Sequence, residues 1–193
     1  MDSLMNRRRL MQLLVLGVTA AETAACTSEN KTPKGWKKVS VGHVDFNVPD
    51  EWQQVDIPED AAVTGWDYAM QDKADFYDDD LRCRLLVMSH GTGDIFENPP
   101  TDARSMALAL AGVELFGGGT ALKPQKLNEK SGELWQLNYR TSSNISDDTG
   151  EKDYAFVAQD TNDGPIAVLG LTGPGISDEI VKKFSKGIRV KND

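Results

Sequence analysis

Three consecutive segments in the second half of the chain constrain its fold more than any other feature. Residues 134–141 and 153–159 alternate apolar and polar side chains, and residues 165–171 are apolar on both faces between Ile166 and Leu169. A period of two predicts β-strands, and the Asp163-Gly164 pair before the last segment is a strong signal for a hairpin turn. The three segments therefore predict an antiparallel meander whose last strand is central and covered on both faces.

Other strands are expected on either side of this meander. Residues 36–41 and 43–48 alternate around Gly42 and predict a β-hairpin, which Pro49 ends because proline lacks a backbone N–H. Shorter strands are expected at residues 52–56, 63–70, 81–90, 121–127 and 188–190.

Two helices are predicted from capping residues and from apolar residues at helical spacing. The first is capped by Thr101 or Asp102 and runs to about residue 115, before the glycines at 117–119. The second is capped by Ser177 and stops at Gly187, with acidic residues in its first turn and lysines toward its end. This order of elements predicts an α+β fold, with one helix on each side of a mainly antiparallel sheet.

The first 25 residues have the features of an export signal. Arg7, Arg8 and Arg9 precede an apolar run at 10–21, which is shorter than the roughly 20 residues that span a bilayer. The run leads to Ala24-Ala25-Cys26, the small-small-Cys pattern of a bacterial lipobox, although Thr23 stands where leucine is usual. We therefore expect a signal peptide at 1–25, a lipidated Cys26 with a flexible tether at 26–35, and one domain at 36–193.

Two alternatives remain open for this segment. Cleavage near residues 18–20 would leave Cys26 as an unmodified thiol on a freely secreted protein. Residues 6–11 also resemble the twin-arginine export pattern, beside the general export route.

The charge balance excludes some partners. The chain has 30 acidic and 21 basic residues and a formal net charge of −9. Phosphate backbones and anionic lipid surfaces attract clustered Lys and Arg, so we expect no nucleic-acid partner and no polybasic membrane contact. Membrane attachment would come from the lipid on Cys26, at the extracytoplasmic face of the cell membrane.

An acidic stretch at residues 72–80 is the one candidate for a metal site. We interpret it as a solvated loop, because it lacks the sixth-position glycine and the later glutamate of an EF-hand. If it binds calcium, the ligands are expected to be Asp75, Asp78, Asp79 and Asp80.

Cys83 and His90 are the one thiol and imidazole on a single predicted strand. Their odd separation puts them on opposite faces, and Cys83 falls with the apolar set, so we interpret it as a core residue. Signatures such as Gly-x-Ser-x-Gly are absent. We therefore expect no catalytic residue and no cofactor.

Two patterns resemble a known family. Phe46-x-Val48-Pro49-x-x-Trp52 resembles the opening of PsbP-like domains, and Lys183-Phe184-x-x-Gly187-Ile188-x-Val190 resembles their terminal helix. Together with the export signal, the whole chain resembles the actinobacterial LpqN/LpqT-type lipoproteins. The resemblance implies an α/β/α sandwich around an antiparallel sheet, and a non-enzymatic binding or assembly module for an unknown protein or cell-envelope ligand. The alternatives are a secreted cell-envelope hydrolase that uses paired carboxylates, and a calcium-binding surface protein.

Overall fold

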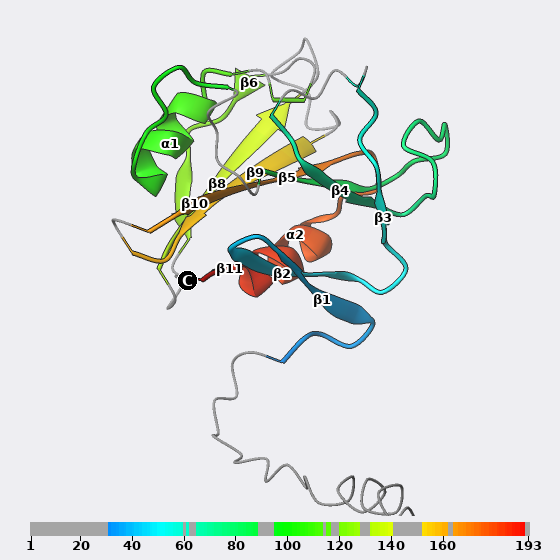
Figure 1. Ribbon diagram of the computed structural model, residues 1–193. Coiled ribbons are helices and arrows are strands. Elements are labelled where there is room, and N and C mark those ends of the chain that lie inside the picture. Colours follow the sequence, from blue (N-terminus) through cyan, green and yellow to red (C-terminus); the bar gives the residue numbers. More distant parts are fainter. Residues whose placement is uncertain are drawn as a thin grey trace, which may run out of the picture. The chain divides into compact units, whose positions relative to one another are not determined.

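The computed structural model describes residues 31–59, 61, 65–88, 95–113, 115–116, 120–127, 132–140, 152–161 and 164–191. Residues 32–193 belong to one compact unit (Figure 1). The predicted signal peptide, Cys26, His90 and the glycines at 117–119 lie outside the described residues. Among the described helices, none is long and apolar enough to cross a membrane.

The larger of two antiparallel sheets forms the middle layer of the domain. Its centre is the predicted meander, in which β10 lies between β5 and β9, so the prediction of a central last strand is confirmed. In spatial order its strands are β3 (Gln53–Val55), β4 (Tyr68–Gln71), β5 (Arg84–Met88), β10 (Ile166–Thr172), β9 (Lys152–Gln159), β8 (Glu133–Arg140) and β6 (Thr120–Ala121), with β7 (Gln125–Leu127) also paired to β8.

A second, three-stranded sheet holds the predicted hairpin. Strands β1 (Trp36–Val41) and β2 (Val44–Pro49) pair around Gly42, whose φ of 51° is left-handed. Strand β11 (Arg189–Val190) then pairs with the other edge of β2. This separate sheet was not predicted, because which strands pair across a long stretch of chain is not a local property of the sequence.

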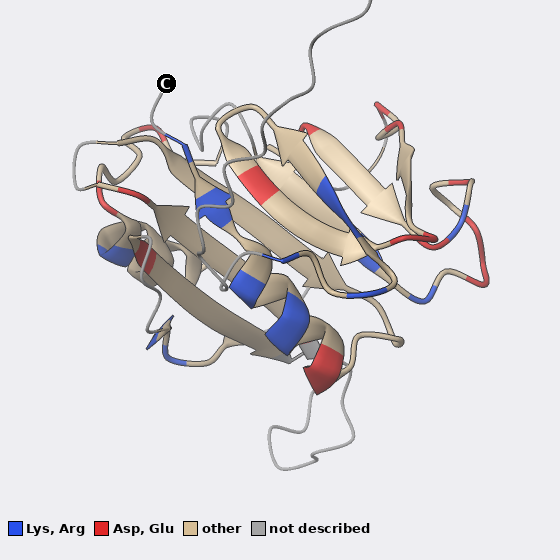
Figure 2. Ribbon diagram, turned by 90° about the horizontal axis from the view of Figure 1, so that it is seen from below, with Lys and Arg blue, Asp and Glu red and all other residues tan. Residues whose placement is uncertain are grey.

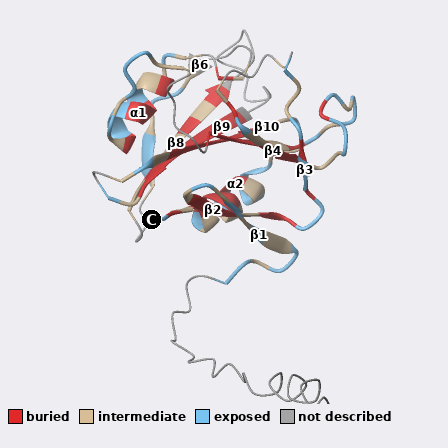
Figure 3. Cartoon of the chain, viewed as in Figure 1, coloured by how far each residue is buried: buried red, intermediate tan, exposed pale blue. Residues whose placement is uncertain are grey.

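The two described helices cover opposite faces of the large sheet, as predicted (Figure 1). Helix α1 (Ala103–Leu110) packs Met106 and Leu110 against one face. Helix α2 (Asp178–Gly187) and the small sheet cover the other face, where Phe184 meets Phe156 of β9 with ring centroids 5.3 Å apart. Both faces of the central strands are thus buried (Figure 3), which confirms the α+β class.

Several element boundaries differ from the prediction. Helix α1 begins after Asp102 as expected but ends at Leu110, because Gly112 favours a turn over a further helical turn. The strand expected at 121–127 is two short strands, and Pro124 lies between them without an N–H to donate. The strands expected at 63–70 and 81–90 are shorter, as β4 and β5.

Candidate functional site

A surface hollow of about 270 Å³ lies where the chain enters the domain. It is bounded by the start of β1, the end of β2 and the first turns of α2. The side chains that matter for its chemistry are Trp36, Pro49, Glu51, Glu179, Ile180 and Lys183.

Local structure brings these residues together. Trp36 is directly opposite Pro49 in the β1–β2 register, and Asp50 N donates to Gly35 O at 3.0 Å, which closes the end of the hairpin. Gly35 has a φ of 77°, a left-handed conformation that turns the chain into β1. On the helix side, the Ser177 side chain accepts from Ile180 N at 3.3 Å and fixes the start of α2.

The hollow is lined by apolar side chains, which we call its floor (Trp36 and Ile180), and by charged ones, which we call its rim (Glu51, Glu179 and Lys183). Trp36 and Ile180 are half-buried, and each contributes apolar surface that solvent still reaches. The Lys183 ammonium is 5.8 Å from the centroid of the Trp36 ring and 2.7 Å from Glu179 Oε1. Helix α2 carries acidic residues in its first turn and lysines further along (Figure 2).

Glu51 and Glu179 are two carboxylates on one hollow, the arrangement that a hydrolase of paired carboxylates would need. A general acid in such a pair has a raised pKa, so that it still carries a proton near neutral pH. The hydrogen bond from Lys183, followed by its charge, instead lowers the pKa of Glu179. Glu179 is therefore ionised at neutral pH and suits an ion pair better than proton donation.

The acidic stretch at 72–80 uses its carboxylates to shape its own turns. Asp75 Oδ1 accepts from Tyr77 N at 3.0 Å, and Asp78 Oδ1 accepts from Asp80 N at 2.8 Å. Asp72 Oδ1 accepts from two backbone N–H groups of residues 82 and 83. No group of three or more His, Cys, Asp or Glu within the described residues could hold a metal ion, so Asp75, Asp78, Asp79 and Asp80 are not gathered as one ligand set. Calcium binding here stays a prediction.

Cys83 is 7% exposed and lies on the apolar face predicted for it, beside Leu85 and Val87. Burial, assisted by the charges of Asp72 and Glu51, raises the pKa of its thiol to about 11. A thiol that keeps its proton at neutral pH is a poor nucleophile, so the side chain is suited to packing.

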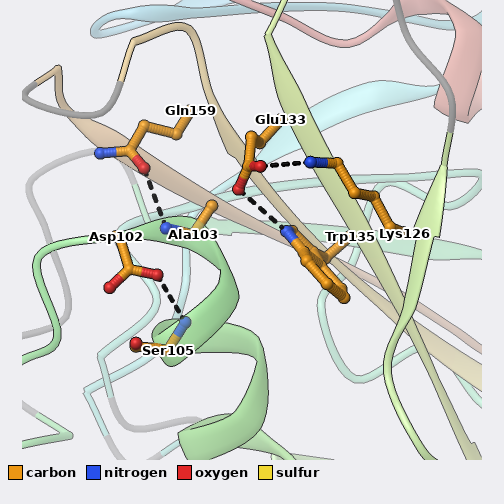
Figure 4. A network of polar contacts seen from close by, with 7 residues as sticks. All are labelled: Asp102, Ala103, Ser105, Lys126, Glu133, Trp135 and Gln159. Carbon is orange, nitrogen blue, oxygen red and sulfur yellow. Dashed lines mark hydrogen bonds and ion pairs between the residues drawn. The ribbon is translucent and has the colours of Figure 1, made fainter.

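A polar network fixes the start of α1 (Figure 4). The buried side chain of Gln159 accepts from Ala103 N at 2.9 Å and donates to Thr101 O and Gly164 O, while Asp102 Oδ1 accepts from Ser105 N at 2.8 Å. Each of these contacts satisfies a backbone group of a helix end or a turn, so their role is structural.

Nearby, Glu133 pairs with Lys126 and accepts from Trp135 Nε1 at 3.3 Å (Figure 4). Lys126 Nζ lies 5.8 Å from the Trp135 ring centroid, which repeats the Lys–Glu–Trp arrangement of the hollow. A cavity of about 10 Å³, room for roughly one water molecule, is lined by Glu133 and Leu134 but not by Lys126 or Trp135.

No family model matches the chain, and no curated protein matches it. Among solved structures, the solution structure of cyanobacterial PsbP (CyanoP) from Synechocystis sp. PCC 6803 is similar, with 15% identity, a TM-score of 0.48, and coverage of 81% of this chain and 92% of that one. That structural neighbour is a PsbP protein, the type that the hairpin and terminal helix resemble.

A crystal structure from Bacteroides thetaiotaomicron is also similar, with 11% identity and a TM-score of 0.32 over 82% of this chain. This chain matches only 50% of that longer one. Because both TM-scores are below 0.5, the α+β assignment stands on the sheet order and the helix positions of this chain itself.

The sequence alone did not identify the hollow. It placed Trp36 at the start of the domain and Ile180 on the buried stripe of α2, without indicating that they meet. Trp36 itself could have indicated the site. It follows a polar, glycine-containing segment that offers no apolar neighbours to cover its ring, so a partly exposed tryptophan was to be expected there.

Proposed function

We propose that this chain is an exported, lipid-anchored protein of the LpqN/LpqT type, which acts as a non-enzymatic binding or assembly module through the hollow beside Trp36. The lipobox at Cys26 supports the anchor. The hollow carries the binding part of the proposal, because it offers a partly exposed tryptophan, an apolar floor and a charged rim on one surface.

These features are those of a recognition site for part of a partner. Binding pockets combine apolar and aromatic lining with a few polar groups that fix orientation. Tryptophan is also enriched among the residues that dominate interface affinity. The fixed ion pair between Glu179 and Lys183 gives the rim a defined pattern of charge.

The position of the hollow suits work close to a membrane. If Cys26 carries the lipid, nine residues at 27–35 separate it from Trp36. Such a segment spans at most about 36 Å when fully extended. A partner bound at Trp36 would therefore lie near the membrane surface, as expected for an assembly or transfer factor.

The anchor is tested by the intact mass of the mature protein from a bacterial membrane fraction. The proposal expects a chain that begins at Cys26 and carries acyl groups, and it expects both features to be lost in Cys26→Ala. A soluble, unacylated product would refute the anchor.

The binding part is tested by photo-crosslinking in the intact cell envelope. A photoreactive amino acid at position 179 lies on the hollow, and one at position 108 lies on the exposed side of α1, where Leu108 is 54% exposed. The proposal expects a discrete crosslinked product from position 179 that is absent from position 108. Equal products at both positions, or none at 179, would contradict it.

A further inference from the structure

The Trp36 ring already carries a positive charge at its face. Lys183 Nζ lies 5.8 Å from the ring centroid, within the range in which an indole attracts a cation. Glu179 neutralises this lysine at 2.7 Å, so the pair adds no net charge to the rim. Glu51 has no ion-pair partner among the described residues, so the lining of the hollow carries one net negative charge. The nearby Lys37 ammonium donates to the backbone O atoms of Asp50 and Trp52, on either side of Glu51.

The surface next to Glu51 is acidic as well. Asp50 precedes it in the turn after β2, and both Glu51 and Asp72 act through their charges on the same side chain, Cys83. The stretch 72–82 that begins at Asp72 carries five aspartates against Lys73 and Arg82. A cation that approaches the Glu51 side of the hollow is therefore attracted, and an anion is repelled.

The helix end does not reverse this preference. An α-helix N-terminus attracts anions, but Asp178 and Glu179 occupy the first turn of α2 and Ser177 caps it. A further anion there would meet two carboxylates at short range.

The size of the hollow limits what enters it. Pockets for drug-sized ligands have about 300–1,000 Å³, whereas this one has about 270 Å³. This volume accommodates one long side chain with its charged end.

The Lys126–Glu133–Trp135 group repeats the ring contact outside the hollow (Figure 4). Its lysine lies at the same 5.8 Å from the ring, and its glutamate forms an ion pair with that lysine, as Glu179 does with Lys183. This group therefore serves as an internal control, a tryptophan with the same charged neighbours that does not line the hollow.

We infer that the hollow binds one arginine or lysine side chain of a basic peptide segment in a partner protein, stacked on Trp36 and facing Glu51, with neighbouring basic residues toward the acidic stretch at 72–82. The inference rests on the proposed function and names the chemical class of its partner. Because exposed charges drive the approach, salt is expected to weaken the contact.

The test uses the mature protein and a fluorescein-labelled peptide, Ser-Gly-Arg-Ala-Arg-Gly-Ser. A matched peptide with citrulline in place of both arginines keeps the shape and removes the charge. Fluorescence anisotropy measures affinity, and the Trp36 Nε1–H signal in an NMR titration, assigned by its loss in Trp36→Leu, reports the place of binding.

Binding of the arginine peptide is expected to shift the Trp36 signal and leave the Trp135 signal in place. Trp36→Leu is expected to weaken binding about fivefold, the loss of one cation–π contact. Glu51→Gln is expected to weaken it by about threefold, and Trp135→Leu is expected to have no effect. Thermal melting of each variant verifies that it is folded.

Equal binding of the citrulline peptide, or binding that Trp36→Leu and Glu51→Gln leave unchanged, would overturn the inference. Absence of arginine-peptide binding would overturn it too. In either case a crosslink from position 179 would still support the hollow as a binding site, whereas loss of that crosslink would remove the proposed function itself.

Discussion

Asp45 of β2 and Lys191, directly after β11, form an ion pair of 2.8 Å that fastens the end of the described chain to the N-terminal hairpin. Lys38 of β1 pairs with the other carboxylate oxygen at 2.6 Å, and the Ser40 hydroxyl donates to the first at 2.6 Å. One nearly buried carboxylate thus connects β1, β2 and the residue after β11. The start of β1 and the end of β2 line the hollow.

Asp45→Asn is expected to destabilise the protein in a pH-dependent way. Burial raises the pKa of Asp45, but the hydrogen bonds from Lys191, Lys38 and Ser40 outweigh it and lower the pKa from 3.8 to about 2. The carboxylate therefore contributes about 2 kcal/mol of stability above its ordinary pKa, and this is lost as the pH falls through the folded pKa.

Urea unfolding of wild type and variant at pH 7, 4 and 2 measures this effect. The difference in free energy of unfolding between wild type and Asp45→Asn should be largest at pH 7 and should shrink between pH 4 and pH 2. Asp50→Asn, at an exposed position beside the same sheet, is the matched control for the loss of one carboxylate. A difference that stays constant with pH would show that the carboxylate charge is not responsible.

Gly170→Ala is expected to destabilise the central strand β10. A Cβ at this position would lie 2.8 Å from the Phe116 ring and 2.9 Å from the Trp66 ring, and these two rings stack with centroids 6.1 Å apart. Overpacking of this kind costs about 1–3 kcal/mol. Thermal and urea unfolding measure the cost.

Two variants sharpen this test. Gly112→Ala places its Cβ 3.6 Å from its nearest neighbour and should be neutral or stabilising. Phe116→Ala in the Gly170→Ala background should cost less than it does in wild type, because there the loss of the ring also relieves the clash with the new methyl group. Additive effects would mean that Phe116 is not the source of the strain.

Local signals explain why much of the fold could be predicted. The β1–β2 hairpin, the meander and the Ser177 cap of α2 each depend on residues that are close in sequence. The pairing of β11 with β2 depends on residues that are far apart in the chain, and no pattern within either strand indicates it. The domain therefore has two sheets, whereas the sequence predicted a single sheet.

The candidate site was harder to predict for the same reason. Trp36 and Lys183 meet because α2 packs against β2, the partner of β1 in the hairpin, although α2 and the hairpin lie near opposite ends of the domain's sequence. Cys83 was assigned correctly, since the face of a strand follows directly from its period of two. The buried role of Gln159 had no sequence signal, because a polar residue at the end of an alternating strand is usually solvated.

Gln159→Met is expected to loosen the start of α1. The substitution keeps the size of the side chain but removes the acceptor for Ala103 N and the donors to Thr101 O and Gly164 O. Each buried group left unsatisfied costs about 1–3 kcal/mol, so a total of roughly 3 kcal/mol is expected. Gln136→Met removes a half-buried contact to Asn138 and should cost far less.

Hydrogen exchange separates this local effect from general destabilisation. Amides of α1 should lose protection in Gln159→Met more than amides of β9 and β10 do. Uniform loss of protection across the sheet would show that Gln159 acts on the core and not on the helix start.

The Cys83 thiol is expected to react slowly in the folded protein. Its raised pKa of about 11 leaves very little thiolate at pH 8, and the thiol is closely covered, since a Cβ on Gly175 would lie only 2.8 Å from its sulfur. Labelling with a thiol reagent in a Cys26→Ala background should be slow without denaturant and fast in urea. The folded rate should follow the stability of each variant above, because opening of the structure limits the reaction. A fast folded rate that Gly170→Ala does not change would mean that Cys83 is open to solvent and available for chemistry.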